Sequence, residues 1–171
     1  LISHFAVVLS AQNRIIEKVR NSGAEAIVCP DNMVLYGEKL SYGMDQIAGD
    51  IVIMAEAEYA FPEHDIDKLL CYLQEADMVV GTRTTRQLIE QGSDMRGVVR
   101  LANICLAKLI ELLWWRYEIR ISDVGCTFRA IWRSCWDEVR ENLQGRGPEM
   151  LAELAIEMLH DRKRVIEIPV N

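Results

Sequence analysis

Short apolar runs alternate along the chain with segments whose apolar residues recur every three or four positions. The runs at residues 5–9, 26–29, 51–54 and 78–81 have the length and the β-branched composition of strands. The segments at 13–21 and 40–48, and a third that begins near Pro62, have helical spacing. This alternation predicts a three-layer α/β fold, with mostly parallel strands and helices on both faces of the sheet.

The pattern changes in the second half of the chain. Residues 98–117 are apolar on nearly every side, which predicts one long helix whose charged positions leave runs too short to cross a bilayer. This helix is either buried in the core or set against a membrane or another copy of the chain, because Trp114 and Trp115 suit a half-wetted interface. We expect a strand-like stretch at 119–131 with Asp123 near its head, a helix at 149–159 and a strand at 164–169. No repeat or long linker divides the chain, so a single domain over 1–171 is predicted.

Two carboxylates follow the apolar strand at 51–54. Glu56 and Glu58 are separated by one residue, so in an extended chain both side chains leave on the same face. In a parallel sheet the carboxyl ends of the strands are where ligands bind, and Arg83 follows the next strand. A magnesium ion binds through one or two carboxylates and completes its coordination with water and phosphate oxygens. The spacing therefore predicts a divalent metal site with a phosphate ligand, although solvated loop glutamates would show the same pattern.

Composition narrows the classes of function. The 171 residues carry a formal net charge of -7, which gives no long-range attraction for nucleic acid. The five cysteines form no C-x-x-C pair, so they match neither a zinc cluster nor a disulfide framework. Reduced thiols in the cytoplasm are the simplest interpretation. The first residues have no basic region followed by an apolar core, so no signal peptide is expected.

Several motifs in order resemble one enzyme family. They are G-D-I-V-I-M-A-E-A-E, F-P-E-H-D-I-D-K-L-L, D-M-V-V-G-T-R, S-D-V-G-C-T-F-R-A and E-I-P-V-N, and they span about residues 47–171. This succession resembles the family-two glycosyltransferases of the dolichol-phosphate mannosyltransferase type. The resemblance implies a Rossmann-like GT-A fold and transfer of a sugar from a UDP- or GDP-linked donor to an acceptor, often a polyprenyl phosphate. It also implies Mg²⁺ or Mn²⁺ as cofactor and, with the 98–117 helix, peripheral contact with the cytoplasmic membrane face.

The same resemblance suggests roles for individual residues. Glu56-Ala57-Glu58 occupies the place of the family's D-x-D motif, which binds the metal and the nucleotide diphosphate. Arg83 matches the arginine after the G-T pair, and Asp123 matches the acid near the transferred sugar and the acceptor. Arg96 and Arg100 fall where the family keeps basic residues that face phosphate.

The chain also departs from the family pattern. Both D-x-D positions are glutamate, and L-S-A-Q-N stands where a D-x-S-x-D-x-T turn is expected. The glycine-rich stretch is reduced to L-Y-G-E, and the chain is expected to lack the family's first strand and the basic segment that would follow E-I-P-V-N.

Two alternatives follow from the matches and the departures. One is a metal-dependent glycosyltransferase, and the other is a non-catalytic glycosyltransferase-like domain that binds a nucleotide or a protein partner. A dinucleotide-dependent oxidoreductase is set aside because no G-x-G-x-x-G follows any strand. For either alternative we expect Glu56, Glu58, Arg83 and Asp123 around one cleft at the strand ends.

Overall fold

The strands form two sheets. The computed structural model describes residues 4–10, 13–56, 62–82, 105, 123 and 125–170. β1 (Ala6–Ser10) pairs in parallel with β2 (Glu25–Cys29). The second sheet has the order β3-β5-β4-β6, built from β3 (Ile51–Met54), β4 (Met78–Thr82), β5 (Arg129–Trp132) and β6 (Val165–Pro169). β5 runs antiparallel to β3 and β4, whereas β4 and β6 are parallel, so β3, β4 and β6 share one direction.

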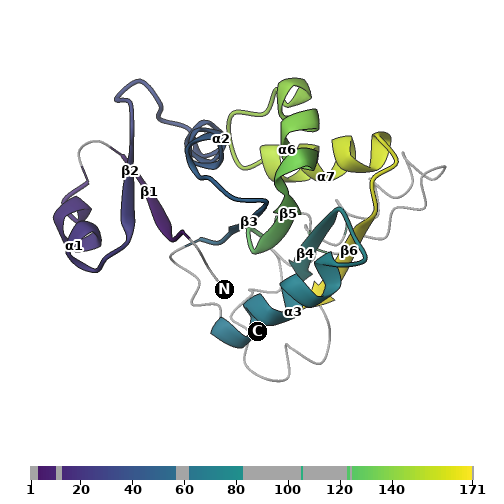
Figure 1. The fold of residues 1–171 in the computed structure, drawn as a ribbon. Coiled ribbons are helices and arrows are strands. Elements are labelled where there is room, and N and C mark those ends of the chain that lie inside the picture. Colours follow the sequence, from purple (N-terminus) through teal and green to yellow (C-terminus); the bar gives the residue numbers. More distant parts are fainter. Residues whose placement is uncertain are drawn as a thin grey trace.

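Helices cover both faces of the four-stranded sheet (Figure 1). α3 (Glu63–Leu73) lies on one face, and α6 (Arg133–Val139) and α7 (Met150–His160) lie on the other. α1 (Ile16–Asn21) packs beside β2, and α2 (Tyr36–Gln46) lies over β1 and β2. A 3-10 turn, η2 (Arg140–Asn142), extends α6. The predicted three-layer α/β fold with mostly parallel strands is confirmed.

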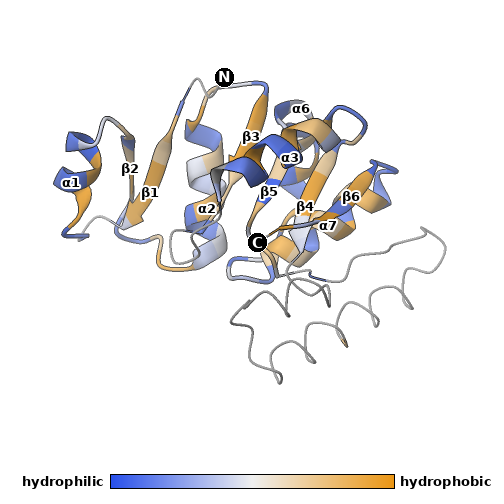
Figure 2. Cartoon of the chain, turned by 90° about the horizontal axis from the view of Figure 1, so that it is seen from below, coloured by the Kyte–Doolittle hydropathy of each residue, from blue (hydrophilic) through white to orange (hydrophobic). Residues whose placement is uncertain are grey.

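The core lies between these layers, and Figure 2 shows that the strands beside it are mainly hydrophobic. Every residue of β4 is buried, which explains why its sequence is a continuous apolar run without alternation. Trp136 and Phe128 are the largest apolar side chains in the fully buried set, and they pack with Leu69 and Leu154 in one cluster. This cluster fixes the four-stranded sheet between α3 and the pair α6 and α7.

Most predicted elements are found with ends shifted by a few residues, one expectation is wrong, and one helix was not expected. The 119–131 stretch is not one strand: among its described residues only Arg129–Trp132 is strand, and Asp123 begins a loop whose Cys126 N–H turns back to the Asp123 carbonyl. The helix α6 directly after β5 was not predicted. Of the helix expected at 98–117, only Cys105 is among the described residues.

α2 begins earlier than the apolar spacing indicates. The backbone N–H of Leu35 donates to Glu38 Oε2 over 3.1 Å, so the glutamate three residues into the helix satisfies a donor that would otherwise be free. The Arg146 guanidinium forms an ion pair with the same carboxylate. Both contacts lower the pKa of Glu38, the backbone hydrogen bond more than the arginine. The carboxylate thus anchors the helix start to the loop that precedes α7.

Gly37→Ala is expected to destabilise the protein although alanine favours helices. A Cβ at this position would lie 2.8 Å from the carbonyl oxygen of Gly147 and 2.9 Å from that of Arg146. Because both neighbours are backbone atoms, the contact is relieved only by moving α2 or the loop, which should lower the free energy of unfolding by about 1–3 kcal/mol. Urea denaturation measures the change. Gln46→Ala, at an exposed position of the same helix, is the control, and an unchanged Gly37→Ala midpoint would contradict the close approach.

Candidate functional site

The carboxyl ends of β3 and β4 meet the start of β5 at one edge of the sheet. Met54 and Val80 are both paired with Arg129, and Val80 is paired on its other side with Glu167. Paired residues on neighbouring strands point to the same face of a sheet. Met54, Arg129, Val80 and Glu167 therefore form one row of side chains on the face covered by α7. Glu56 is partly exposed two residues beyond this row.

Asp123 is buried at the same edge. Its residue surface is 1% exposed, and its backbone N–H donates to Glu167 Oε1 over 2.8 Å. Asp123 was expected near the head of a strand. It lies instead in a loop, where the Glu167 side chain of β6 holds it. Asp123 therefore sits over the row that ends in Glu167.

Arg129 is a completely buried cation beneath this loop. Its Nε donates to the carbonyl of Cys126 over 2.6 Å, and its Nη1 donates to the carbonyl of Leu151 over 2.5 Å. Burial lowers the pKa of Arg129 to about 10, against the opposing effects of the Cys126 thiol, Asp123 and further acidic groups. The guanidinium therefore stays charged at neutral pH and ties the Asp123 loop to the start of α7.

Tyr36, the first residue of α2, connects Glu56 electrostatically with Arg129. Burial, together with the nearby negative charge of Glu56, raises the pKa of Tyr36 to about 12, while Arg129 acts in the opposite direction. Glu56, Tyr36 and Arg129 thus share one electrostatic environment at the strand ends. The sequence interpretation did not include Tyr36 in the site.

The tyrosine is expected to titrate separately from ordinary tyrosines. Because its folded pKa lies near 12 and its unfolded pKa near 10, the unfolded chain releases its proton first, and stability should fall as pH rises between these values. Alkaline titration followed by tyrosinate absorbance should show one late component that Tyr36→Phe removes. Tyr72→Phe, at an exposed position on α3, is the control and should leave the late component in place. A late component that survives Tyr36→Phe would contradict the assignment.

The structure describes only some of the predicted site residues. Glu56 and Asp123 lie at the same sheet edge, whereas Glu58, Arg83, Arg96 and Arg100 lie outside the described residues, so the shared cleft stays a prediction. Within the described part of the chain, no group of three or more His, Cys, Asp or Glu side chains is arranged to hold a metal ion. The metal site at Glu56 and Glu58 therefore also stays a prediction.

Three further residues of this edge were not predicted as part of the site. They are Tyr36, Arg129 and Glu167. The bonds of Arg129 to two backbone carbonyls indicate a structural role. The available signal was a charged residue inside an otherwise apolar strand, as in V-I-E-I-P for Glu167. Such a residue needs a polar partner when the strand is half-buried.

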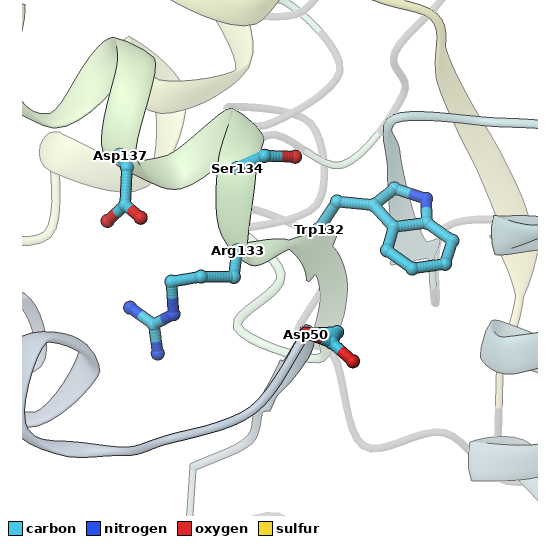
Figure 3. Close-up of a pocket in the computed structure, with 5 residues that line it drawn as sticks. All are labelled: Asp50, Trp132, Arg133, Ser134 and Asp137. Atoms are coloured by element: carbon cyan, nitrogen blue, oxygen red, sulfur yellow. The ribbon is translucent and has the colours of Figure 1, made fainter.

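A surface pocket of about 430 Å³ lies at the other edge of the sheet (Figure 3). It is lined by Asp50, Trp132, Arg133, Ser134 and Asp137. Trp132 is paired with Ile51, at the amino end of β3, so the pocket is separated from Glu56 by the length of that strand. The guanidinium of Arg133 is already engaged by the carbonyls of Met44 and Ile47. This pocket is not part of the predicted site.

The remaining cysteine and membrane expectations can be compared with the described residues. All five cysteines are free, which agrees with reduced thiols. No helix in the described ranges has the length and apolar character needed to cross a membrane.

Comparison with known proteins connects this fold with glycosyltransferases. No protein-family model matches the chain. The chain is 25% identical over 164 residues to the low-salt glycan biosynthesis hexosyltransferase Agl6 of Haloferax volcanii, an alignment that covers 95% of the chain and 38% of that protein. The chain thus spans well under half the length of this curated relative.

Solved structures of glucosyl-3-phosphoglycerate synthase from Mycobacterium tuberculosis have a similar fold. One, in complex with Mn²⁺, UDP and glucosyl-3-phosphoglycerate, has a TM-score of 0.69 at 16% identity and covers 99% of this chain and 60% of the synthase. Another, with Mn²⁺, UDP-glucose and phosphoglyceric acid, has a TM-score of 0.72 at 15% identity and covers 99% and 59%. The expected GT-A fold is therefore shown, and the similarity is to family-two-like glycosyltransferases in general. It does not single out the dolichol-phosphate mannosyltransferase type.

Proposed function

We propose that this chain forms the nucleotide-sugar site of a glycosyltransferase that moves a sugar from a UDP- or GDP-linked donor to an acceptor. The observation that carries the proposal is the position of Asp123, buried and held by Glu167 at the sheet edge where Glu56 follows β3. Ligands of open α/β sheets bind at this edge. The similarity to a hexosyltransferase and to the fold of the synthase supports the same function.

The residues of the edge suit a diphosphate and a divalent cation. Glu56 offers carboxylate oxygens at a partly exposed strand end, which is the ligand type that Mg²⁺ and Mn²⁺ prefer, and Glu58 would complete the pair. When bound, such an ion supplies positive charge that neutralises the departing nucleoside diphosphate. In the proposal Arg83, Arg96 and Arg100 contact the phosphates as fixed cations.

Asp123 is proposed to act on the acceptor. Glu167 holds the backbone N–H of Asp123 in place. The Asp123 carboxylate can then orient a hydroxyl acceptor and accept its proton as the new glycosidic bond forms. A phosphate acceptor is already ionised and needs little base catalysis. The motif resemblance supports a polyprenyl phosphate acceptor and peripheral membrane contact through residues 98–117, whereas the structural neighbours support a small phosphorylated acid.

A non-catalytic, nucleotide-binding domain is the second candidate, and one contact favours it. At the end of β1, where the family resemblance expects an acidic turn, the Nζ of Lys39 donates to Ser10 Oγ over 2.8 Å. A basic side chain at this position would alter the pocket for the base. Loss of turnover with retained nucleotide binding is the expected property of this alternative.

Calorimetry with UDP and GDP, with and without Mn²⁺ or Mg²⁺, tests the proposed site. We expect binding to need both nucleotide and ion, because the carboxylates alone would repel the diphosphate. Glu58→Ala should weaken metal-dependent binding at least about tenfold, corresponding to one lost charge-assisted ligand. Glu157→Ala, on α7, is the control for a general loss of charge.

Two outcomes separate the candidates. Nucleotide affinity that is equal in excess chelator would show that Glu56 and Glu58 hold no metal. Metal-dependent binding without transfer to polyprenyl phosphate or phosphoglycerate acceptors would favour the non-catalytic domain. Transfer that is preserved when both glutamates are shortened to aspartate, and lost in Glu58→Ala, would support the enzyme.

A further inference from the structure

Glu167 is a charged residue in the middle of an otherwise apolar strand. The β6 sequence is V-I-E-I-P, and Glu167 is half-buried there next to Ile168, which is 3% exposed. Carboxylates are rarely kept in such a position without a polar partner, since burial of an unpaired charge is costly. The contacts of this side chain therefore indicate what it does.

The carboxylate of Glu167 binds the backbone of Asp123. Glu167 Oε1 accepts the Asp123 N–H over 2.8 Å, across 44 positions of sequence. A hydrogen bond to an ionised acceptor is stronger than a neutral one. Through this contact β6 fixes the point at which the loop begins, and so the origin of the Asp123 side chain.

Arg129 holds the other end of the same loop. Arg129 donates to the Cys126 carbonyl. It lies in the same row of side chains as Glu167, and Val80 lies between the two in that row. The loop is therefore fixed at Asp123 by an acid on β6 and at Cys126 by a base on β5. Both contacts come from side chains of the packed sheet, which limits the positions open to Asp123 and Cys126.

We propose that Glu167 is a positioning residue, which sets the location of Asp123 for sugar transfer by binding its backbone N–H. The inference rests on the proposed function for its consequence in catalysis, but the positioning itself is a property of the folded chain. Glu167 does not need to touch substrate for this role. Its carboxylate accepts the Asp123 N–H, as a backbone carbonyl of a neighbouring strand would do if Asp123 were part of the sheet.

Amide hydrogen exchange, measured by NMR on the 171-residue chain, tests the positioning without any assay of activity. Glu167→Ala should speed exchange at the Asp123 N–H by about ten- to a hundredfold, the range expected for loss of a hydrogen bond to a charged group. Glu167→Gln keeps a carbonyl acceptor and should retain most of the protection. Ile168→Val, the neighbouring core position, is the control for weakening of β6 and should leave Asp123 protected.

Transfer kinetics provide the second measurement. Glu167→Ala should lower kcat while the nucleotide Kd stays within about threefold, and Glu167→Gln should restore much of kcat. Unchanged exchange at Asp123 in Glu167→Ala, or equal loss of protection throughout β4 and β6, would overturn the proposal. If Asp123 loses protection alone but no variant and no wild-type protein transfers sugar, the positioning stands and the proposed function fails.

Discussion

Arg129→Met is expected to lower the free energy of unfolding by about 3–5 kcal/mol, the usual effect of removing one partner from a buried charged group. The guanidinium is completely buried and satisfies the carbonyls of Cys126 and Leu151. Methionine fills a similar volume but donates no hydrogen bond, so both carbonyls lose the donor that Arg129 supplies. The negative charges of Asp123 and Glu167 would also lose their nearby cation.

Urea denaturation of three variants measures this effect. Arg129→Lys keeps the charge but cannot donate in two fixed directions, so we expect an intermediate loss. Arg20→Met, on the exposed face of α1, should change stability by no more than about 0.5 kcal/mol. A stability of Arg129→Met equal to that of wild type would show that the buried arginine does not hold the loop.

Asp123→Asn is expected to lower transfer to a hydroxyl acceptor by about 10²- to 10⁴-fold, the usual contribution of a general base. The variant keeps the backbone N–H that bonds to Glu167, so the loop should stay in place while the carboxylate loses its basicity. The Kd of the nucleotide sugar should change little, because Asp123 is assigned to the acceptor. Initial rates over a range of donor and acceptor concentrations measure both quantities.

The same variant distinguishes the acceptor classes. With a phosphate acceptor, which needs no deprotonation at neutral pH, the loss should be much smaller than with a hydroxyl acceptor. Asp161→Asn, after the end of α7, is the matched control. Full activity of Asp123→Asn with a hydroxyl acceptor would remove Asp123 from the catalytic assignment.

The local elements were largely predictable because their signals are local. The strand at 51–54 has the predicted bounds, and β4 differs from the expectation by one residue, since β-branched runs flanked by polar residues define their own ends. The start of α2 was missed because Leu35 is an unusual residue before a helix and the cap comes from Glu38. The short helix α6 was missed because it begins at Arg133 directly after β5, with no turn residue between the two elements.

The candidate site was less predictable, for a physical reason. Glu56 and Asp123 were selected as candidates from residue type and resemblance, and both lie at one sheet edge, while their roles stay predictions. The contributions of Arg129 and Glu167 depend on strand pairing, in which β5 lies reversed between β3 and β4. Sequence periodicity contains no information on which strands become neighbours, so a buried charge and its partners are revealed only by the assembled sheet.

Arg133 connects α2 to the four-stranded sheet, so we expect the two sheets to unfold together. Its guanidinium binds the carbonyls of Met44 and Ile47 at the end of α2, while its own N–H binds the carbonyl of Asp50 before β3. On its other side α2 packs on β1, where Gly43 meets Val8 closely. The β1–β2 sheet has only two strands, and a sheet of two strands alone is marginally stable in water, so without α2 it would open at low free energy. Among the described residues, its cooperativity with the four-stranded sheet therefore depends on α2, which is held both by Arg133 and by the ion pair of Glu38 with Arg146.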